Sequence, residues 1–572
     1  MAANLASPFR IMLAQLAVLV IGSLAPQAIR AQAPSLTSPT IPGHYLVLFC
    51  SGTAVSDRAQ RLRETGASEV TVHPHLGTAA VSASATAMRR IAADPTVAQV
   101  LPDVRVYAHA LLRSAAVPEQ ASGSVLVRRS APVRPVAVDP LQPVAINNSG
   151  SGNAAKSGSG TPASGGGSGT ASTPAGTQAA GASASSNSGN ANTPAPTDTF
   201  YQGSPQGWAV RAAGGYGMGV LGGTVTGPWN RTLGSGVRIA VLDSGVDRTH
   251  PDIAPNLALN LSEVDSSDDF SPCDDGSPQD QEGHGTWVAS LAAGAMGAST
   301  GRVVGVAPSA TILNIKVLQR MPGTGVTVSA QCQAGQASGL VSWLLKGIDD
   351  AVSQHADVIV LSLGSIVDLY TGDGAGLKSA FDQVTHAAAN AGVLIVAAAG
   401  NDGFDLSNSR YLELPAQARD VLAVTATSNP DCAEDNRTGA ACSAGAVTLP
   451  YYSNYGAPLQ AVAAPGGNYP AGADEAVSGW IRGACSSGVP GTADGAPSDH
   501  AHSYGCFNFG HAAYVQAMGT SASAGLAAGA AALLRATHPA WTPAELAAAM
   551  RSGTTALKGG STLLDTNTAM QR

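Results

Sequence analysis

A short glycine-rich run near the C-terminus places a serine where it could act as a nucleophile. In Gly519–Gly525, Ser521 precedes the small-residue apolar stretch Leu526–Leu534. A hydroxyl at the start of a helix can be exposed, and the positive helix end favours developing negative charge. Serine is also a preferred helix N-cap, and the run alone favours that capping role for Ser521. A nucleophilic role therefore requires a base, an orienting acid and an oxyanion donor elsewhere in the chain.

Three further polar residues lie at the predicted ends of secondary-structure elements. Asp243 follows an apolar strand candidate, at the edge where open α/β sheets place their sites. His284 lies between two glycines just before a predicted helix, and those glycines let backbone and substrate approach the imidazole. Asn401 follows another buried strand and could donate its amide to an oxyanion. Each is alone an ordinary turn or structural residue, but together with Ser521 they favour a single site.

The region from about residue 200 onward has the pattern of an α/β domain. Apolar strand candidates alternate with helical stretches, which predicts a doubly wound, mostly parallel sheet. The predicted strands are 237–242, 311–318, 358–363, 393–398 and 421–426. The predicted helices are 286–295, 335–354, 376–391 and 521–537, with a later one opening at the capping box Thr542–Glu545.

These segments resemble the subtilisin-like serine peptidases, or subtilases, over roughly residues 200–560. The matching segments are Val237–Ile253, Gly283–Gly294, Ser362–Gly364, Ala397–Asn401 and Gly519–Gly529. The resemblance implies a subtilisin-like α/β fold and a serine endopeptidase that hydrolyses peptide bonds through an acyl-enzyme. It assigns Asp243, His284 and Ser521 to a catalytic triad that needs no cofactor for its chemistry. Protein or peptide chains are the implied substrates.

The resemblance also assigns binding roles. The Asn401 amide and the Ser521 N–H would form the oxyanion hole. Ser362, Leu363 and Gly364 would pair with extended substrate backbone, and Ala398, Ala399 and Gly400 would form one wall of the primary specificity pocket. Two positions depart from the family pattern: Ala522–Gly525 replaces Met-Ala-x-Pro, and Trp287 stands where a second histidine is usual. The alternatives are a catalytically silent subtilase fold used for binding and an acid-acting relative with a glutamate base.

Residues 1–33 have the pattern of an export signal. Arg10 precedes the apolar run Ile11–Ile21, and small residues follow up to Ala33. The run is shorter than the roughly 20 residues that span a bilayer. We therefore expect secretion to an extracellular or periplasmic location without membrane contact after signal removal; an uncleaved anchor is the alternative.

Two segments separate the signal from the predicted peptidase domain, residues 200–565. In residues 44–110 the strand and helix candidates follow the order β-α-β-β-α-β, which predicts a ferredoxin-like α+β domain. The segment resembles the inhibitor-type propeptide of subtilases, most clearly in Ala92–Asp103, and this implies a zymogen inhibited by its own propeptide. An unrelated small α+β domain is the alternative. Residues 111–199, rich in Gly, Ser, Ala, Pro and Thr, predict a disordered linker.

Charge and cysteine content add two constraints. The 30 basic and 38 acidic residues give a net charge of −8, which argues against a nucleic-acid partner. Of the seven cysteines, Cys50 lies early and six lie in the predicted peptidase domain, where an exported protein favours disulfides. Six cysteines allow 15 pairings. Sequence proximity suggests the pairs Cys432–Cys442 and Cys485–Cys506, which leaves Cys273 with Cys332.

An acidic stretch precedes His284. Its members are Asp265, Asp268, Asp269, Asp274, Asp275 and Asp280. Family members often bind structural calcium, and carboxylates suit that ion. The spacing is not diagnostic, so a solvated acidic loop is the preferred interpretation and no metal-ligating residue is assigned.

Overall fold

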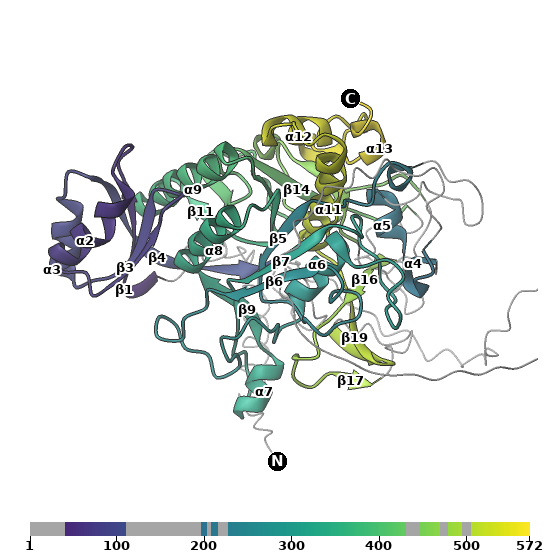
Figure 1. The fold of residues 1–572 in the computed structure, drawn as a ribbon, viewed down its shortest axis with the longest axis horizontal. Coiled ribbons are helices and arrows are strands. Elements are labelled where there is room, and N and C mark those ends of the chain that lie inside the picture. Colours follow the sequence, from purple (N-terminus) through teal and green to yellow (C-terminus); the bar gives the residue numbers. More distant parts are fainter. Residues whose placement is uncertain are drawn as a thin grey trace, which may run out of the picture. The chain divides into compact units, whose positions relative to one another are not determined.

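The computed structural model describes residues 40–109, 196–202, 207–214, 227–430, 445–468, 479–494 and 505–572 (Figure 1). All of these residues belong to one compact unit, formed by Gln32–Val117 and Asn187–Arg572. The predicted signal, nearly all of the predicted linker, and Cys432 and Cys442 lie outside the described residues. In the described part, no helix is both long and apolar enough to cross a membrane.

A parallel sheet of eight strands carries the larger part of the fold, in the order β20-β15-β14-β12-β10-β5-β7-β6. Its strands are β5 (Arg238–Asp243), β6 (Leu257–Ser262), β7 (Thr311–Lys316), β10 (Val358–Leu361), β12 (Leu394–Ala398), β14 (Val421–Thr427), β15 (Val462–Pro465) and β20 (Thr562–Leu563). Every neighbouring pair runs parallel. The central strands are apolar throughout because both faces of the sheet are covered. The predicted doubly wound α/β class is confirmed.

Helices cover both faces of this sheet and create two hydrophobic cores. The helices are α4 (Thr199–Gln202), α5 (Trp208–Ala213), α6 (His284–Ala293), α7 (Val328–Gln333), α8 (Val341–Ser353), α9 (Gly372–Asn390), α11 (Thr520–Thr537), α12 (Pro543–Met550) and α13 (Thr566–Ala569). Helices α6 and α11 pack on Ile239 and Val241 of β5, whereas α8 and α9 share the core of Ala240 and Leu242. Successive side chains of β5 point to opposite faces of the sheet and therefore contribute to both cores. The predicted capping box is confirmed, since Thr542 and Glu545 bond reciprocally at the start of α12.

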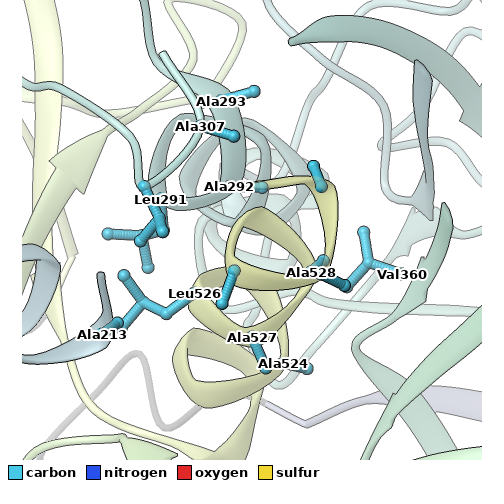
Figure 2. Packing of buried hydrophobic residues seen from close by; sticks show 14 of the residues in the cluster. Ala213, Leu291, Ala292, Ala293, Ala307, Val360, Ala524, Leu526, Ala527 and Ala528 are labelled. Carbon is cyan, nitrogen blue, oxygen red and sulfur yellow. The ribbon is translucent and has the colours of Figure 1, made fainter. Parts of the chain in front are cut away.

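Helices α6 and α11 approach each other closely because small residues line their contact (Figure 2). A Cβ added at Gly525 would lie 3.0 Å from the Val288 carbonyl oxygen. One added at Gly529 would lie 2.6 Å from the Ala292 carbonyl oxygen. Residues four apart on one helix therefore face residues four apart on the other. This packing gives a structural reason for the glycine that replaces the usual proline at position 525.

One predicted helix is wrong in its first part. Residues 335–354 do not form a single helix, because Gln336–Leu340 is strand β9 and α8 begins only at Val341. Strand β9 pairs with β8 (Gln319–Met321) on one side and with β4 (Val97–Ala108) on the other. These pairings outweigh the local preference of a short Gly/Ala/Ser-containing segment.

Residues 40–108 form a small α+β domain with a core of its own. Its elements are β1 (Thr40–Phe49), α2 (Val55–Thr65), β2 (Glu69–His73), β3 (Thr78–Ser82), α3 (Ala85–Ala92) and β4 (Val97–Ala108). This is the β-α-β-β-α-β order, and the antiparallel strands lie in the order β4-β1-β3-β2. The end of β4 continues beyond this sheet and pairs with β9 and with β11 (Leu363–Asp368). Strand β11 pairs in turn with β13 (Tyr411–Leu414).

A third, smaller sheet lies next to α6. It contains β16 (Ile481–Ala484), β17 (Ala493–Asp494), β18 (Gly505–Phe509) and β19 (Ala512–Ala517). The disulfides Cys273–Cys332 and Cys485–Cys506 are present as predicted, and Cys50 is an exposed free thiol. The disulfide of Cys485 packs on Gly283, where an added Cβ would lie 2.6 Å from its sulfur.

Candidate active site

Asp243 and His284 meet at the carboxyl edge of the parallel sheet. Asp243 is the last residue of β5, and His284 is the first residue of α6. Their side chains are fully buried, with His284 Nδ1 2.6 Å from Asp243 Oδ1. The Ser244 N–H also donates to Asp243 Oδ1 at 2.7 Å. The carboxylate therefore fixes both the orientation and the tautomer of the imidazole.

The surroundings of His284 make it a stronger base than an ordinary histidine. Burial alone would lower its pKa, but the Asp243 carboxylate and the nearby Glu282 and Asp280 outweigh burial and raise the pKa above its usual value. Among the described residues, no group hydrogen-bonds to His284 Nε2. The nitrogen that would take a proton is thus left open.

The glycines around His284 serve protein packing. Gly283 adopts a φ of +97° at the N-cap of α6, which favours glycine. A Cβ on Gly285 would lie 2.2 Å from the Gly245 carbonyl oxygen. Protein groups do approach these glycines closely, and they are a disulfide and the turn after β5. The approach of a substrate to the imidazole stays a prediction.

Ser521 lies in the first turn of α11 and is buried. It does not cap the helix, because the N-cap is Gly519 and no side chain accepts a capping hydrogen bond there. Its Oγ instead donates to the Ser362 carbonyl oxygen at 3.3 Å, and Ser362 Oγ donates to the Ser521 carbonyl at 3.1 Å. The predicted capping role is thus wrong. Between these two described residues, Ser521 and His284, there is no hydrogen bond, so the third link of the predicted triad stays a prediction.

Asn401 is held at the same edge of the sheet. Its Oδ1 accepts hydrogen bonds from the backbone N–H and the hydroxyl of Thr520, both at 2.9 Å. Those two bonds orient the amide so that Nδ2 donates to the carbonyl oxygen of His109, at the end of the small domain. An amide fixed by its oxygen and directed at a peptide carbonyl has the geometry of an oxyanion donor.

The predicted substrate-binding segment is occupied by the chain's own strand β4. Leu363 pairs with Ala108 and Gly364 with Tyr107 in antiparallel register. The His109 N–H donates to the Ser362 carbonyl oxygen at 2.9 Å. An extended peptide thus joins β11 through main-chain hydrogen bonds, as in β-augmentation.

The residues predicted for the pocket wall divide into two groups. Gly400 faces the pocket, since an added Cβ would lie 3.0 Å from Oε2 of the buried Glu413. Ala398 and Ala399 have buried side chains that belong to the two hydrophobic cores. Substrate contact through these two alanines stays a prediction.

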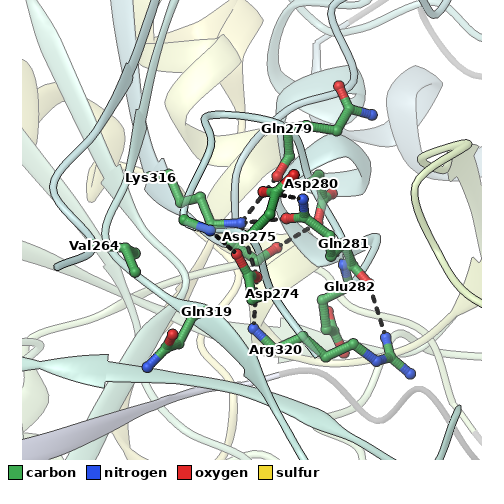
Figure 3. Close-up of polar contacts among 12 residues, drawn as sticks. Val264, Asp274, Asp275, Gln279, Asp280, Gln281, Glu282, Lys316, Gln319 and Arg320 are labelled. Carbon is green, nitrogen blue, oxygen red and sulfur yellow. Dashed lines mark hydrogen bonds and ion pairs between the residues drawn. The ribbon is translucent and has the colours of Figure 1, made fainter. Parts of the chain in front are cut away.

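The acidic stretch before His284 is only partly a solvated loop (Figure 3). The Lys316 ammonium, fully buried, donates to Asp274 Oδ2 at 2.9 Å and to Gln281 Oε1 at 2.6 Å. Asp280 is also buried, and its carboxylate accepts the Gly283 N–H at 2.7 Å and the Ser244 hydroxyl at 2.9 Å. The solvated-loop interpretation is therefore wrong for these two aspartates, which bind a lysine and cap α6.

A metal site was left unassigned in this stretch. Within the described residues, no group of three or more His, Cys, Asp or Glu side chains could hold a metal ion. Asp269 is paired with Arg105 of the small domain at 2.6 Å. Structural calcium stays a prediction.

Two residues at the site, Glu413 and His109, were not identified from the sequence. Glu413, in β13, is fully buried and lies 3.3 Å from His109 Nε2. Burial raises the pKa of Glu413 to about 7, against the opposing effect of His109. A glutamate between Leu412 and Leu414 was the available signal, because a carboxylate buried among apolar residues requires a partner.

The fold and the site define a subtilisin-like α/β protein with a buried carboxylate–imidazole pair beside a helix-borne serine. A family model described as "Subtilase family" matches residues 234–567. Subtilisin of Bacillus pumilus is 32% identical over 324 residues, which are 57% of this chain and 86% of that protein. Thermitase of Thermoactinomyces vulgaris is 33% identical over 238 residues, 42% of this chain and 66% of thermitase. The chain belongs to the subtilase family.

Other similarities cover less of the relative or show only the fold. The intracellular serine protease of Paenibacillus polymyxa is 33% identical over 201 residues, which are 35% of this chain and 52% of that protein. The chain thus spans about half the length of that relative. Fervidolysin of Fervidobacterium pennivorans superposes with a TM-score of 0.54 at 17% identity, over 95% of this chain and 62% of fervidolysin. At that identity the likeness supports the fold alone.

Proposed function

We propose that this protein is a secreted serine endopeptidase made as a zymogen, with Asp243, His284 and Ser521 as its catalytic triad. The observation that carries the proposal is the placement of a peptide segment of the same chain at the site. The His109 N–H and the Ser521 hydroxyl donate to the same Ser362 carbonyl oxygen, while the His109 carbonyl accepts from Asn401. A peptide carbonyl thus accepts from the candidate oxyanion donor, and the N–H of the same residue shares a backbone acceptor with the candidate nucleophile; this arrangement supports the proposal.

Each residue would have one role in peptide-bond hydrolysis. After a small rotation of its side chain, Ser521 Oγ attacks the carbonyl carbon while His284 Nε2 takes the hydroxyl proton. His284 then gives this proton to the leaving amine as the C–N bond breaks, and water hydrolyses the resulting ester by the reverse roles. Asp243 stabilises the imidazolium formed in each half-reaction. Asn401 Nδ2 and the Ser521 N–H stabilise the oxyanion.

The small domain, residues 44–110, would be the propeptide and intramolecular inhibitor. Its contacts with the peptidase domain extend beyond β4. The His75 N–H donates to Asp349 Oδ1 of α8 at 2.8 Å, and Gln383 of α9 donates to the Gly77 carbonyl at 2.9 Å. Asp103 of β4 accepts the Ser342 N–H at 3.1 Å at the start of α8, which has no side-chain cap of its own. Such contacts favour the docked state and block the substrate-binding strands.

The test is expression of the full chain with Ser521→Ala. We expect loss of processing between the small domain and the peptidase domain, and loss of labelling by a fluorophosphonate probe. Ser523→Ala is the matched control, because Ser523 lies in the same helix turn but donates to the Pro465 carbonyl. Processing of Ser521→Ala at the wild-type rate would contradict self-processing. Absence of probe labelling in the wild-type protein would favour a silent subtilase fold.

A further inference from the structure

The end of strand β4 lies in the site as a substrate would, and it therefore reports which side chain the site accepts. Residues 105–107 pair with β9 in the register Arg105↔Leu340, Val106↔Gly339 and Tyr107↔Ser338. On the other edge of the strand, Tyr107 and Ala108 pair with Gly364 and Leu363 of β11. A peptide held as the middle strand of three has a fixed register, so each of its side chains has a defined environment.

His109 is the residue whose carbonyl reaches the oxyanion donor. Its backbone makes a hydrogen bond at each end, to the Ser362 carbonyl through N–H and to Asn401 through C=O. Ser521 Oγ donates to the same Ser362 carbonyl as the His109 N–H, so the His109 backbone and the candidate nucleophile share one acceptor. The side chain of His109 lies in a pocket bounded by Gly364 and Glu413, where the primary specificity residue of a substrate is expected.

At the far side of this pocket is a buried carboxylate. Glu413 Oε1 lies 3.3 Å from His109 Nε2, and the two side chains are only 1% and 10% exposed. Within the described residues, His109 provides the one ion-pair partner of Glu413 that lies within 4 Å. Its other polar neighbours are uncharged: the backbone N–H of Ser365 donates to the carboxylate, and the amide of Asn454 lies 3.5 Å from Glu413 Oε2.

Glycines on two walls leave the space for this pair. A Cβ on Gly364 would lie 2.4 Å from Glu413 Oε1 and 2.7 Å from His109 Cε1. A Cβ on Gly400 would lie 3.0 Å from Glu413 Oε2. Any larger residue at position 364 would therefore separate the imidazole from the carboxylate.

The negative charge of this pocket comes from Glu413 of the peptidase domain, and its ion-pair partner comes from the bound peptide segment. A buried carboxylate without a partner is unfavourable, so it either takes up a proton or binds a cation. A residue that brings a positive charge or an N–H donor to Glu413 removes this penalty on binding. A leucine or a glutamate at the same place leaves the carboxylate unpaired or repelled.

We propose that Glu413 is a specificity-determining residue that makes this endopeptidase cleave after basic residues, and that the His109–Ala110 bond is its first substrate. The inference rests on the proposed peptidase function. In that first turnover the His109 carbonyl carbon bonds to Ser521 Oγ as the C–N bond to Ala110 breaks. The proton from Ser521 passes through His284 to the Ala110 nitrogen, and water then releases His109 as a free carboxylate.

The first experiment examines the full chain as it matures. Mass spectrometry of the released small-domain fragment should find His109 at its C-terminus. His109→Lys and His109→Arg should process at rates within about threefold of wild type, whereas His109→Leu and His109→Glu should be at least tenfold slower. A fragment ending elsewhere, or equal rates for Leu and Lys at this position, would overturn the proposal.

The second experiment uses the processed enzyme and peptides with the sequence Arg-Val-Tyr-Ala-X before a chromogenic amide. We expect kcat/KM for X = Lys, Arg or His to exceed that for X = Leu by at least tenfold. Glu413→Gln keeps the volume and should lower the ratio of kcat/KM for X = Lys to that for X = Leu to about one. Glu263→Gln, the same change at a carboxylate 3.6 Å from Lys346, should leave the preference intact.

The outcomes separate this inference from the proposed function. If the enzyme cleaves X = Leu as well as X = Lys, the pocket assignment fails while the peptidase stands. If no peptide is cleaved and the fluorophosphonate probe does not label Ser521, the proposed function itself fails. If Glu413→Gln does not fold, the His109 series in the wild-type background still decides the assignment.

Discussion

Two buried carboxylates at the site, Asp243 and Glu413, differ in where their partners come from. Asp243 Oδ1 accepts hydrogen bonds from Ser244 N–H and His284 Nδ1, both supplied by the peptidase domain. Glu413 has its ion-pair partner, His109, in the small domain at the other end of the site. The first carboxylate has its partners within the peptidase domain, whereas the ion-pair partner of the second comes from the docked segment.

This difference in the source of the partner predicts that Asp243 affects the rate of turnover and that Glu413 affects the selectivity between peptides. A permanent partner preorganises the base for every substrate, so a change at Asp243 should lower the rate on all peptides alike. An exchangeable partner discriminates between peptides, so a change at Glu413 should alter the ratio between them. The two regions can therefore be tested independently with the same pair of Lys and Leu peptides.

The largest effect is expected for Asp243→Asn. The amide would hold the wrong tautomer of His284 and could not stabilise the imidazolium, so kcat should fall about 10⁴-fold. The loss should be equal for Lys and Leu peptides. Steady-state kinetics at pH 8 measure it, with Asp373→Asn, at an exposed position in the first turn of α9, as a control for the substitution itself. A loss confined to Lys peptides would contradict the separation of the two carboxylates.

Asn401→Leu should have the second largest effect. The oxyanion would lose a side-chain donor, and kcat should fall about 10²–10³-fold with a much smaller change in KM. Because Asn401 also accepts two hydrogen bonds from Thr520, thermal unfolding must be measured beside the kinetics. An unchanged kcat in a folded variant would remove Asn401 from the oxyanion hole.

Gly529→Ala tests how much the close contact between α6, which carries His284, and α11 contributes to the free energy of unfolding. The added methyl would overlap the Ala292 carbonyl and Val306, so we expect a loss of about 1–3 kcal/mol in the free energy of unfolding. Gly372→Ala, at a helix start with open space, is the matched control and should be neutral. Denaturant unfolding gives both values. The Lys-to-Leu selectivity ratio should stay the same in either variant.

The smallest effect is a pH dependence of selectivity. Burial, and the nearby Asp402 carboxylate, raise the pKa of Glu413 to about 7 against the opposing effect of His109. Glu413 is thus neutral at acid pH and ionises as the pH rises through about 7, whereas a lysine substrate stays charged over this range. The kcat/KM ratio of Lys to Leu peptides should increase with pH between 6 and 8. Glu413→Gln should give a flat ratio, and a flat ratio in the wild type would contradict ionisation of Glu413.

The sequence alone predicts the parallel sheet well because both faces of its strands are buried. Runs such as Val358–Leu361 are apolar at every position, and that pattern has few other interpretations. Residues 336–340 were misassigned because their strand character depends on β8 and β4, which are remote in sequence or belong to another domain. No local pattern carries that information.

At the site, polar residues at strand and helix ends could be predicted and interior partners could not. Asp243 and His284 follow turn and glycine signals, and the structure places them 2.6 Å apart. Glu413 gives a weaker signal, because its role depends on the register that brings His109 into the same pocket. Likewise, Ser521 as an N-cap was a reasonable local prediction that the position of Gly519 overturns.

The Ser362 carbonyl oxygen accepts from both the peptide N–H and the Ser521 hydroxyl. A single atom therefore couples the binding of a peptide to the position of the candidate nucleophile's hydroxyl. A peptide methylated on that amide nitrogen loses its donor and directs a methyl group at the same oxygen. Such a peptide could neither pair with β11 nor approach the Ser521 hydroxyl. N-methylation at this one nitrogen therefore offers a route to peptides that this protein would not cleave.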